Sequence, residues 1–201
     1  AQIANGNFAG AICTDASFQN ATLADLIANG SSYFTRARFD GANLQRADLK
    51  DADLTNTSLR GANLAKAQVQ GTKLIGAKLD ADTELDQIGI DHKTRWLDVR
   101  WNGALVTGVP WDQARHPYLG DEQLVQPPPG ERERRTQRIA FSRQYDRAQR
   151  IVISRQIARA YRGVQQAQRA QGMLTLAAHY RLVEQSYEIR ALRYERRWLR
   201  W

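Results

Sequence analysis

The chain has 201 residues, of which 42% are hydrophobic and 25% are charged, and these ordinary values for a globular protein argue against intrinsic disorder. Its single cysteine, Cys13, excludes an internal disulfide framework and every cysteine-rich metal motif. The longest apolar runs have about five residues, far fewer than the roughly twenty of a transmembrane helix. We therefore predict a cytoplasmic protein, with the cytoplasmic face of a membrane as the alternative location.

The net charge of +8 is concentrated at one end of the chain. Residues 1–80 contain 8 basic residues (Lys and Arg) and 7 acidic residues (Asp and Glu). Residues 81–130 contain 4 basic and 8 acidic residues, and residues 131–201 contain 17 and 6. The corresponding charges are +1, −4 and +11. A basic last third points to an anionic or acidic binding partner there.

A five-residue pattern runs through residues 1–80. In each block an apolar residue follows a small one by two positions, as in Ala42/Leu44 and Ala47/Leu49. Because a period of five fits neither a helix nor a strand, the chain must turn at each block. Blocks that form the sides of a square coil would point the small and the apolar residue inward. The predicted core of the stacked coils is Phe34, Phe39, Leu44, Leu49, Leu54, Leu59, Leu64, Val69, Leu74 and Leu79.

Four of these blocks have the form Ala-Asp-Leu or Ala-Asn-Leu, beginning at Ala42, Ala47, Ala52 and Ala62. They resemble the A(D/N)LXX consensus of the pentapeptide repeat family. The resemblance covers residues 1–80 and implies a right-handed quadrilateral β-helix of about four coils. Residues 24–30 shift the register by one, so we expect a bulge or small loop there. We place the end of this domain at residue 82.

Residues 83–130 are predicted to form a cap and a linker. Trp96, Trp101 and Trp111 would cover the open end of the β-helix, and the run Pro127–Gly130 would be a stiff linker. Carboxylates at alternate positions from Asp80 are spaced as in a calcium loop, but Leu85 stands where such a loop needs glycine. The histidines are far apart in the sequence. We predict an acidic cap, with no metal, cofactor or catalytic site.

Residues 131–201 show helical spacing of apolar residues, with a break at Gly172. We predict two antiparallel helices with a turn near Gln171-Gly172, so that the whole chain is mainly β plus α. The segment also resembles a tetratricopeptide-type helix pair. The resemblance rests on Tyr161, Val164, Gly172, Leu174 and Ala177.

All 17 basic residues of 131–201 are arginines, which bind carboxylates and phosphates through two parallel hydrogen bonds. Arginines at the end of a helix also complement the helix dipole, so a solvated end is an alternative interpretation. The predicted contacts with a protein partner or an anionic membrane surface are Arg193, Arg196, Arg197, Trp198, Arg200 and Trp201.

The predicted function is a non-catalytic scaffold that docks a protein partner, at a membrane surface or as part of an oligomer or larger complex. One alternative is a DNA mimic that inhibits topoisomerases, as some pentapeptide repeat proteins do. The net charge of +1 in residues 1–80 argues against it, because mimicry requires a strongly negative surface. A second alternative is an Arg-rich nucleic-acid-binding protein, although no recognised nucleic-acid-binding motif accompanies the charge.

Overall fold

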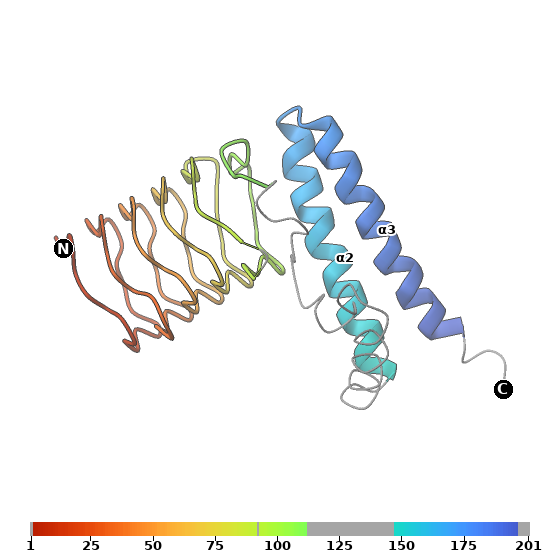
Figure 1. Cartoon of the computed structure of the whole chain (residues 1–201), viewed down its shortest axis with the longest axis horizontal. Coiled ribbons are helices and arrows are strands. Elements are labelled where there is room, and N and C mark those ends of the chain that lie inside the picture. Colours follow the sequence, from red (N-terminus) through yellow and green to blue (C-terminus); the bar gives the residue numbers. More distant parts are fainter. Residues whose placement is uncertain (1, 92, 112–146, 197–201) are drawn as a thin grey trace.

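The computed structural model describes residues 2–91, 93–111 and 147–196. Square coils stack along one axis, and two antiparallel helices stand across the C-terminal end of the stack (Figure 1). The helices are α2 (Arg147–Ala170) and α3 (Leu174–Arg196). Gly172 turns the chain between them with a φ of 76°, a conformation that favours glycine. The predicted helix pair is therefore confirmed.

Parallel β-bridges join each described coil to the next, one on each of the four sides. Bridged residues are 20 to 22 apart, as in Asn43↔Asn63. There the Leu44 amide donates to the Asn63 carbonyl (2.7 Å), and the Asn63 amide donates to the Ala42 carbonyl (2.9 Å). The bridges are isolated and no extended strands form in the described coils, because the chain turns after every fifth residue.

The corners are tight turns that repeat with the sequence. The Ala47 amide donates to the Leu44 carbonyl (3.1 Å), and Arg46 between them has a φ of 58°. Most non-glycine residues with positive φ are Asn or Asp, which tolerate this conformation best. Gly71 occupies such a corner, where a Cβ atom would overlap the Asp51 carboxylate. The corners therefore select glycine, asparagine and aspartate.

The ten predicted core side chains are all at most 3% exposed. Ring packing adds to the core near its N-terminal end, where Phe18 and Phe39 stack with centroids 5.0 Å apart. Some of the small inward residues are threonines, and their buried hydroxyls donate to backbone carbonyls, as Thr72 does to Leu49 (2.6 Å). Cys13 lies half-buried in the first coil, and burial raises the pKa of its thiol. Its inward position is typical of a small hydrophobic residue.

The β-helix does not end at residue 82. Bridges continue from Asn63↔Glu84 to Lys78↔Arg100, so residues 84–100, which were predicted as part of a cap, contribute to a fifth coil. The five-residue pattern is hidden because corners 80–83 and 91–94 each contain one extra residue. Each longer corner is closed by a threonine hydroxyl that donates to an aspartate carboxylate, Thr83 to Asp80 (3.0 Å) and Thr94 to Asp91 (3.1 Å).

The predicted bulge at residues 24–30 is also corrected. Leu26 and Ala28 are buried, and Ile27 between them bridges both Asn7 and Asp48, so this side of the coil is regular. The extra residue lies at the following corner, 29–32. The Ser32 hydroxyl there donates to the Phe8 carbonyl (2.9 Å). Thr83 and Thr94 likewise lie within hydrogen-bond distance of a backbone carbonyl of the preceding coil, Leu59 (3.0 Å) and Val69 (2.9 Å), so the same contact marks all three changes of register.

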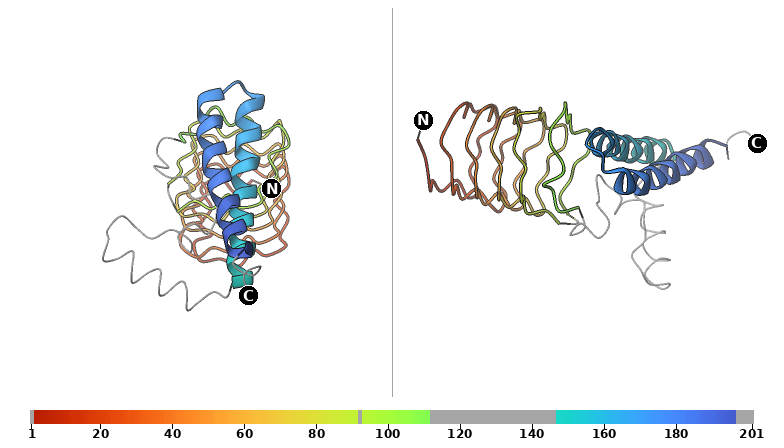
Figure 2. Two further views of the ribbon diagram at one scale, coloured as in Figure 1. Left: turned by 90° about the vertical axis from the view of Figure 1, so that its right-hand side faces the viewer. Right: turned by 90° about the horizontal axis from the view of Figure 1, so that it is seen from above.

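The helix pair covers the C-terminal end of the coils (Figure 2). Trp96 and Trp101 lie inside the last coil and stack at 5.4 Å. Trp111 packs against both, and its ring also meets Tyr180 of α3 at 6.2 Å. The tryptophans are thus part of the continuous core, and α2 and α3 provide the cover that was expected from residues 83–130. The predicted linker 127–130 lies outside the described residues.

Candidate interaction surfaces

The inner face of α3 is fully used in packing against α2. Tyr180 and Tyr187 are buried, and Tyr161 of α2 stacks on Tyr187 at 6.1 Å. Arg162 of α2 forms ion pairs with Glu184 (2.7 Å) and Glu188 (3.2 Å). At the other end of the helices, Arg155 pairs with Glu195 at 2.5 Å. Every acidic residue of α3 therefore already faces an arginine of α2.

The opposite side of α3 carries a second apolar stripe. At about 100° per residue, six side chains fall within roughly a quarter of the helix circumference, on the side away from Tyr180 and Tyr187. We call them the outer stripe: Leu174, Ala178, Leu182, Gln185, Ile189 and Leu192. All six are exposed, including Leu182 at 67%. A surface helix normally shows one apolar face, so the outer stripe is an additional exposed surface with apolar side chains.

Arginines border the outer stripe. Arg181 and Arg193 are exposed and form no ion pair among the described residues. The Arg190 guanidinium lies over the Tyr187 ring, 4.8 Å from its centroid. Since the glutamates of α3 are paired with α2, the surface around the outer stripe is basic.

The sequence-predicted contact residues are only partly within the described chain. Arg193 is exposed beside the outer stripe, and Arg196 is the last residue of α3. Arg197, Trp198, Arg200 and Trp201 lie outside the described residues. The predicted contacts with protein or membrane therefore remain predictions.

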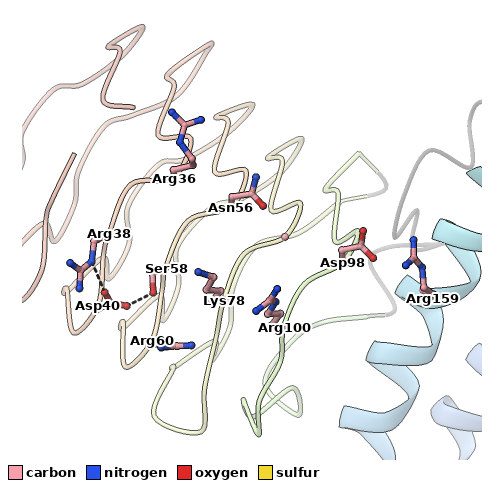
Figure 3. Close-up of a pocket in the computed structure, with 11 residues that line it drawn as sticks. Arg36, Arg38, Asp40, Asn56, Ser58, Arg60, Lys78, Asp98, Arg100 and Arg159 are labelled. Atoms are coloured by element: carbon pink, nitrogen blue, oxygen red, sulfur yellow. Dashed lines mark hydrogen bonds and ion pairs between the residues drawn. The ribbon is translucent and has the colours of Figure 1, made fainter. Parts of the chain in front are cut away.

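A second surface is a basic groove of about 870 Å³ that runs along one side of the β-helix to α2 (Figure 3). Arg38, Ser58, Lys78 and Arg100 occupy successive bridge positions on this side, and Arg159 of α2 stands at its end. Among the described residues it is lined by six cations and two carboxylates: Arg36, Arg38, Arg60, Lys78, Arg100 and Arg159, and Asp40 and Asp98.

Two of these cations are neutralised by neighbours. Arg36 makes two hydrogen bonds to Asp15 of the preceding coil (2.6 and 2.7 Å), which lower the pKa of that carboxyl. Arg38 pairs with Asp40 at 3.4 Å, and Asp40 also accepts a hydrogen bond from Ser58.

The other four cations, Arg60, Lys78, Arg100 and Arg159, have no ion pair among the described residues. Asp98 likewise has none within the part of the chain that is described. Four cations against one anion leave the groove with a net charge of +3.

Sequence reasoning missed this groove because it treated residues 1–80 as a nearly neutral whole. The signal in the sequence is the residue type at every fourth block, because blocks four apart lie on the same side of the coil. Positions 38, 58, 78 and 100 share one side of the coil, and three of them are basic. The charge is therefore sorted by side, which a net count conceals.

Two of the acidic residues that follow position 79 bind the backbone of the coil. Asp80 and Asp91 each accept a hydrogen bond from a backbone amide of the preceding coil, at Gly61 (2.8 Å) and Gly71 (2.9 Å). Among the residues that the structure describes, no group of three or more His, Cys, Asp and Glu is placed to hold a metal ion. Within the same residues, neither helix is long and apolar enough to cross a bilayer.

Comparison with known proteins identifies the repeat. Residues 32–67 and 42–80 match the family "Pentapeptide repeats", with eight copies. Residues 32–80 therefore contain pentapeptide repeats. No curated protein matches the chain.

Similar solved structures are also pentapeptide repeat proteins. One from the cyanobacterium Cyanothece 51142 is 23% identical over 46% of this chain and 62% of its own, with a TM-score of 0.32. One from the Arabidopsis thaliana thylakoid lumen is 26% identical over 49% and 67%, with a TM-score of 0.30. QnrB1, a plasmid-mediated fluoroquinolone resistance protein, is 19% identical over 49% and 57%, with a TM-score of 0.29. The chain thus spans about six tenths of the length of these proteins.

Proposed function

We propose that the protein is a non-catalytic scaffold that docks a protein partner through the outer stripe of α3. The observation that carries this proposal is the second apolar face of α3, on which Leu182, Ile189 and Leu192 are each at least 46% exposed. The β-helix supports it as a rigid base, because hydrogen bonds join every described coil to the next. Two hydrogen bonds of the Gln171 side chain and the contact between Trp111 and Tyr180 hold α2 and α3 against that base.

The proposed occupant is an amphipathic helix with acidic residues beside its apolar face. Its apolar face would fill the outer stripe, and its carboxylates would pair with Arg181 and Arg193. A second copy of this chain fits less well, because two antiparallel α3 helices would bring their own arginines together. Gln185 lies in the middle of the stripe, and its amide can hydrogen-bond to another helix. It has no such partner in a lipid interior.

A designed peptide tests this docking. The probe is a 21-residue amphipathic helix with leucines on one face and glutamates beside them, and a copy with lysines in place of the glutamates is its control. We expect the glutamate peptide to bind the full chain in isothermal titration calorimetry, and the lysine peptide to bind at least tenfold more weakly. Leu182→Asp should remove binding, whereas Val152→Asp, at an exposed apolar site on α2, should not.

Two other occupants are separated in the same experiment. If Leu182→Asp abolished a concentration-dependent dimer in sedimentation equilibrium, while neither peptide bound, the occupant would be a second copy. If the chain floated with phosphatidylglycerol vesicles through the same residues, and neither peptide bound, the occupant would be a membrane. Either result would overturn the proposed helix partner.

DNA mimicry receives no support from the charge distribution. A mimic needs closely spaced negative charge, whereas one side of the β-helix carries the basic groove with its net charge of +3. A gyrase supercoiling assay that showed inhibition by the pure protein would contradict this conclusion.

A further inference from the structure

We propose that the basic groove binds an extended, carboxylate-rich peptide segment, at a site separate from the outer stripe. The groove contains four cations without ion pairs among the described residues: Arg60, Lys78, Arg100 and Arg159. Cations that face solvent without a counter-charge attract an anionic ligand. Because three of them are arginines, their planar guanidinium groups suit carboxylate or phosphate oxygens.

The groove has the length of a short extended peptide. Arg38 and Arg100 are three coils apart on the same side, which corresponds to about 14 Å at about 4.8 Å per coil. An extended chain covers that distance with about four residues at about 3.3 Å each. Alternate side chains of such a segment would face the groove, so about two carboxylates can meet its cations at once.

The remaining polar groups of the groove favour a peptide over a nucleic acid. Asp40 and Asp98 are hydrogen-bond acceptors, and Asn56 can both donate and accept. A peptide brings carboxylates for the cations and backbone N–H donors for Asp98. A phosphodiester backbone brings acceptors alone, so its phosphates would meet Asp98 unfavourably. Among the residues that the structure describes, no aromatic side chain lines the groove to stack on bases, as single-stranded nucleic-acid sites usually require.

Fluorescence anisotropy with labelled hexaglutamate and the full chain tests this site. We expect binding at low ionic strength that weakens as salt is added, because the contacts are exposed and ionic. The double variant Lys78→Ala/Arg100→Ala should weaken binding about tenfold, since each solvent-accessible charge contributes about threefold. Lys93→Ala removes an exposed lysine outside the groove and should leave binding unchanged. Circular dichroism of each variant verifies that the fold is retained.

A twelve-residue oligothymidine and a polyacrylate of equal charge are the competing probes. Polyacrylate carries carboxylates without N–H donors, so it should bind more weakly than hexaglutamate. Tighter binding of oligothymidine, lost in Lys78→Ala/Arg100→Ala, would overturn the peptide assignment in favour of nucleic acid. Equal loss of hexaglutamate binding in Lys93→Ala would show that net charge, and not the groove, holds the ligand.

Asp98 distinguishes a peptide site from a general anion site. Asp98→Asn keeps a residue that tolerates the positive φ of 54° but removes the negative charge. Oligothymidine should gain affinity from this change, while hexaglutamate should gain less because the neutral amide oxygen is a weaker acceptor for its N–H groups than the carboxylate. Leu182→Asp should leave hexaglutamate binding intact, so failure of the groove and failure of the outer stripe are separately visible.

Discussion

The side-chain amide of Gln171 hydrogen-bonds to the backbone at Val106, in the place where the backbone of a further coil would do so. The Val106 amide donates to Gln171 Oε1 at 2.8 Å, and Gln171 Nε2 donates to the Ala104 carbonyl at 2.8 Å. One amide side chain in the turn between α2 and α3 thus satisfies two backbone groups at the last described coil. Unpaired groups at such an edge invite association with other chains, so this contact both closes the edge and attaches the helices.

Replacing Gln171 with leucine should loosen this junction. Two partly buried backbone groups lose their partners, so we expect a loss of about 1–3 kcal/mol in the free energy of unfolding. Amide exchange measured by mass spectrometry should also show faster exchange in the peptide that contains Val106. Gln166→Leu, at an exposed site on α2, is the control and should change neither quantity. Unchanged exchange in Gln171→Leu would show that aromatic packing alone holds the junction.

Trp111 is expected to be the main apolar contact of the same junction. Its ring packs on Trp96, Trp101 and Tyr180, and its Nε1 donates to the Val106 carbonyl at 3.0 Å. Trp111→Ala should cost about 3–5 kcal/mol because it leaves a large cavity. Trp111→Phe should cost less, because it keeps a ring and loses the hydrogen bond. Guanidinium denaturation measures the free energy of unfolding of both variants. An equal loss in the two would contradict the assignment of most of the stabilisation to packing of the ring.

The corner conformation predicts a stabilising substitution. Lys66 has a φ of 61°, and its side chain forms no ion pair among the described residues. Lys66→Gly should therefore raise the free energy of unfolding by about 0.5–1 kcal/mol, as relief of strain exceeds the entropy cost of glycine. Gln68→Gly, two residues later in a bridge with ordinary φ, should lower it. Destabilisation by both variants would refute the role of strain at the corner.

Asp91 should contribute to acid unfolding. Burial raises the pKa of its carboxyl, but hydrogen bonds from the Gly71 and Lys93 amides and from Thr94 outweigh burial and bring it below the ordinary 3.8. The unfolded state therefore binds the proton more tightly than the folded state. The stabilisation is present above pH 3.8 and is lost as the pH falls through the lower, folded-state value.

Asp91→Asn removes this titration and tests its size. We expect the variant to be less stable than the wild type at pH 7, with the difference shrinking as the pH falls below about 4. Thermal unfolding at several pH values gives the measurement. Asp82→Asn, at an exposed carboxylate in the neighbouring long corner, should follow the wild-type curve. A constant difference across the whole pH range would exclude the carboxylate charge as the cause.

The register of the coils shows where sequence reasoning succeeded and where it stopped. Between Phe34 and Leu79 the spacing is strictly five, so the inward side chains could be named from the pattern. Beyond Leu79 the spacing changes to six at two corners, and the coil became invisible although Leu85, Ile90 and Trp96 continue it. The sequence does contain the corner pattern, in which Ser or Thr follows Asn or Asp by three residues. Its role could not be predicted from the sequence, because the hydroxyl contacts a backbone carbonyl of the preceding coil.

The sequence by itself determined the coil and the helix pair, because inward residues at a fixed spacing and helical stripes are local patterns. The tertiary structure decided what no local pattern contains. It placed Arg38, Lys78 and Arg100 on one side, although they are distant in sequence, because each coil returns to the same side after about twenty residues. It also showed that α2 covers only one of the two apolar faces of α3, and this packing choice leaves the outer stripe exposed.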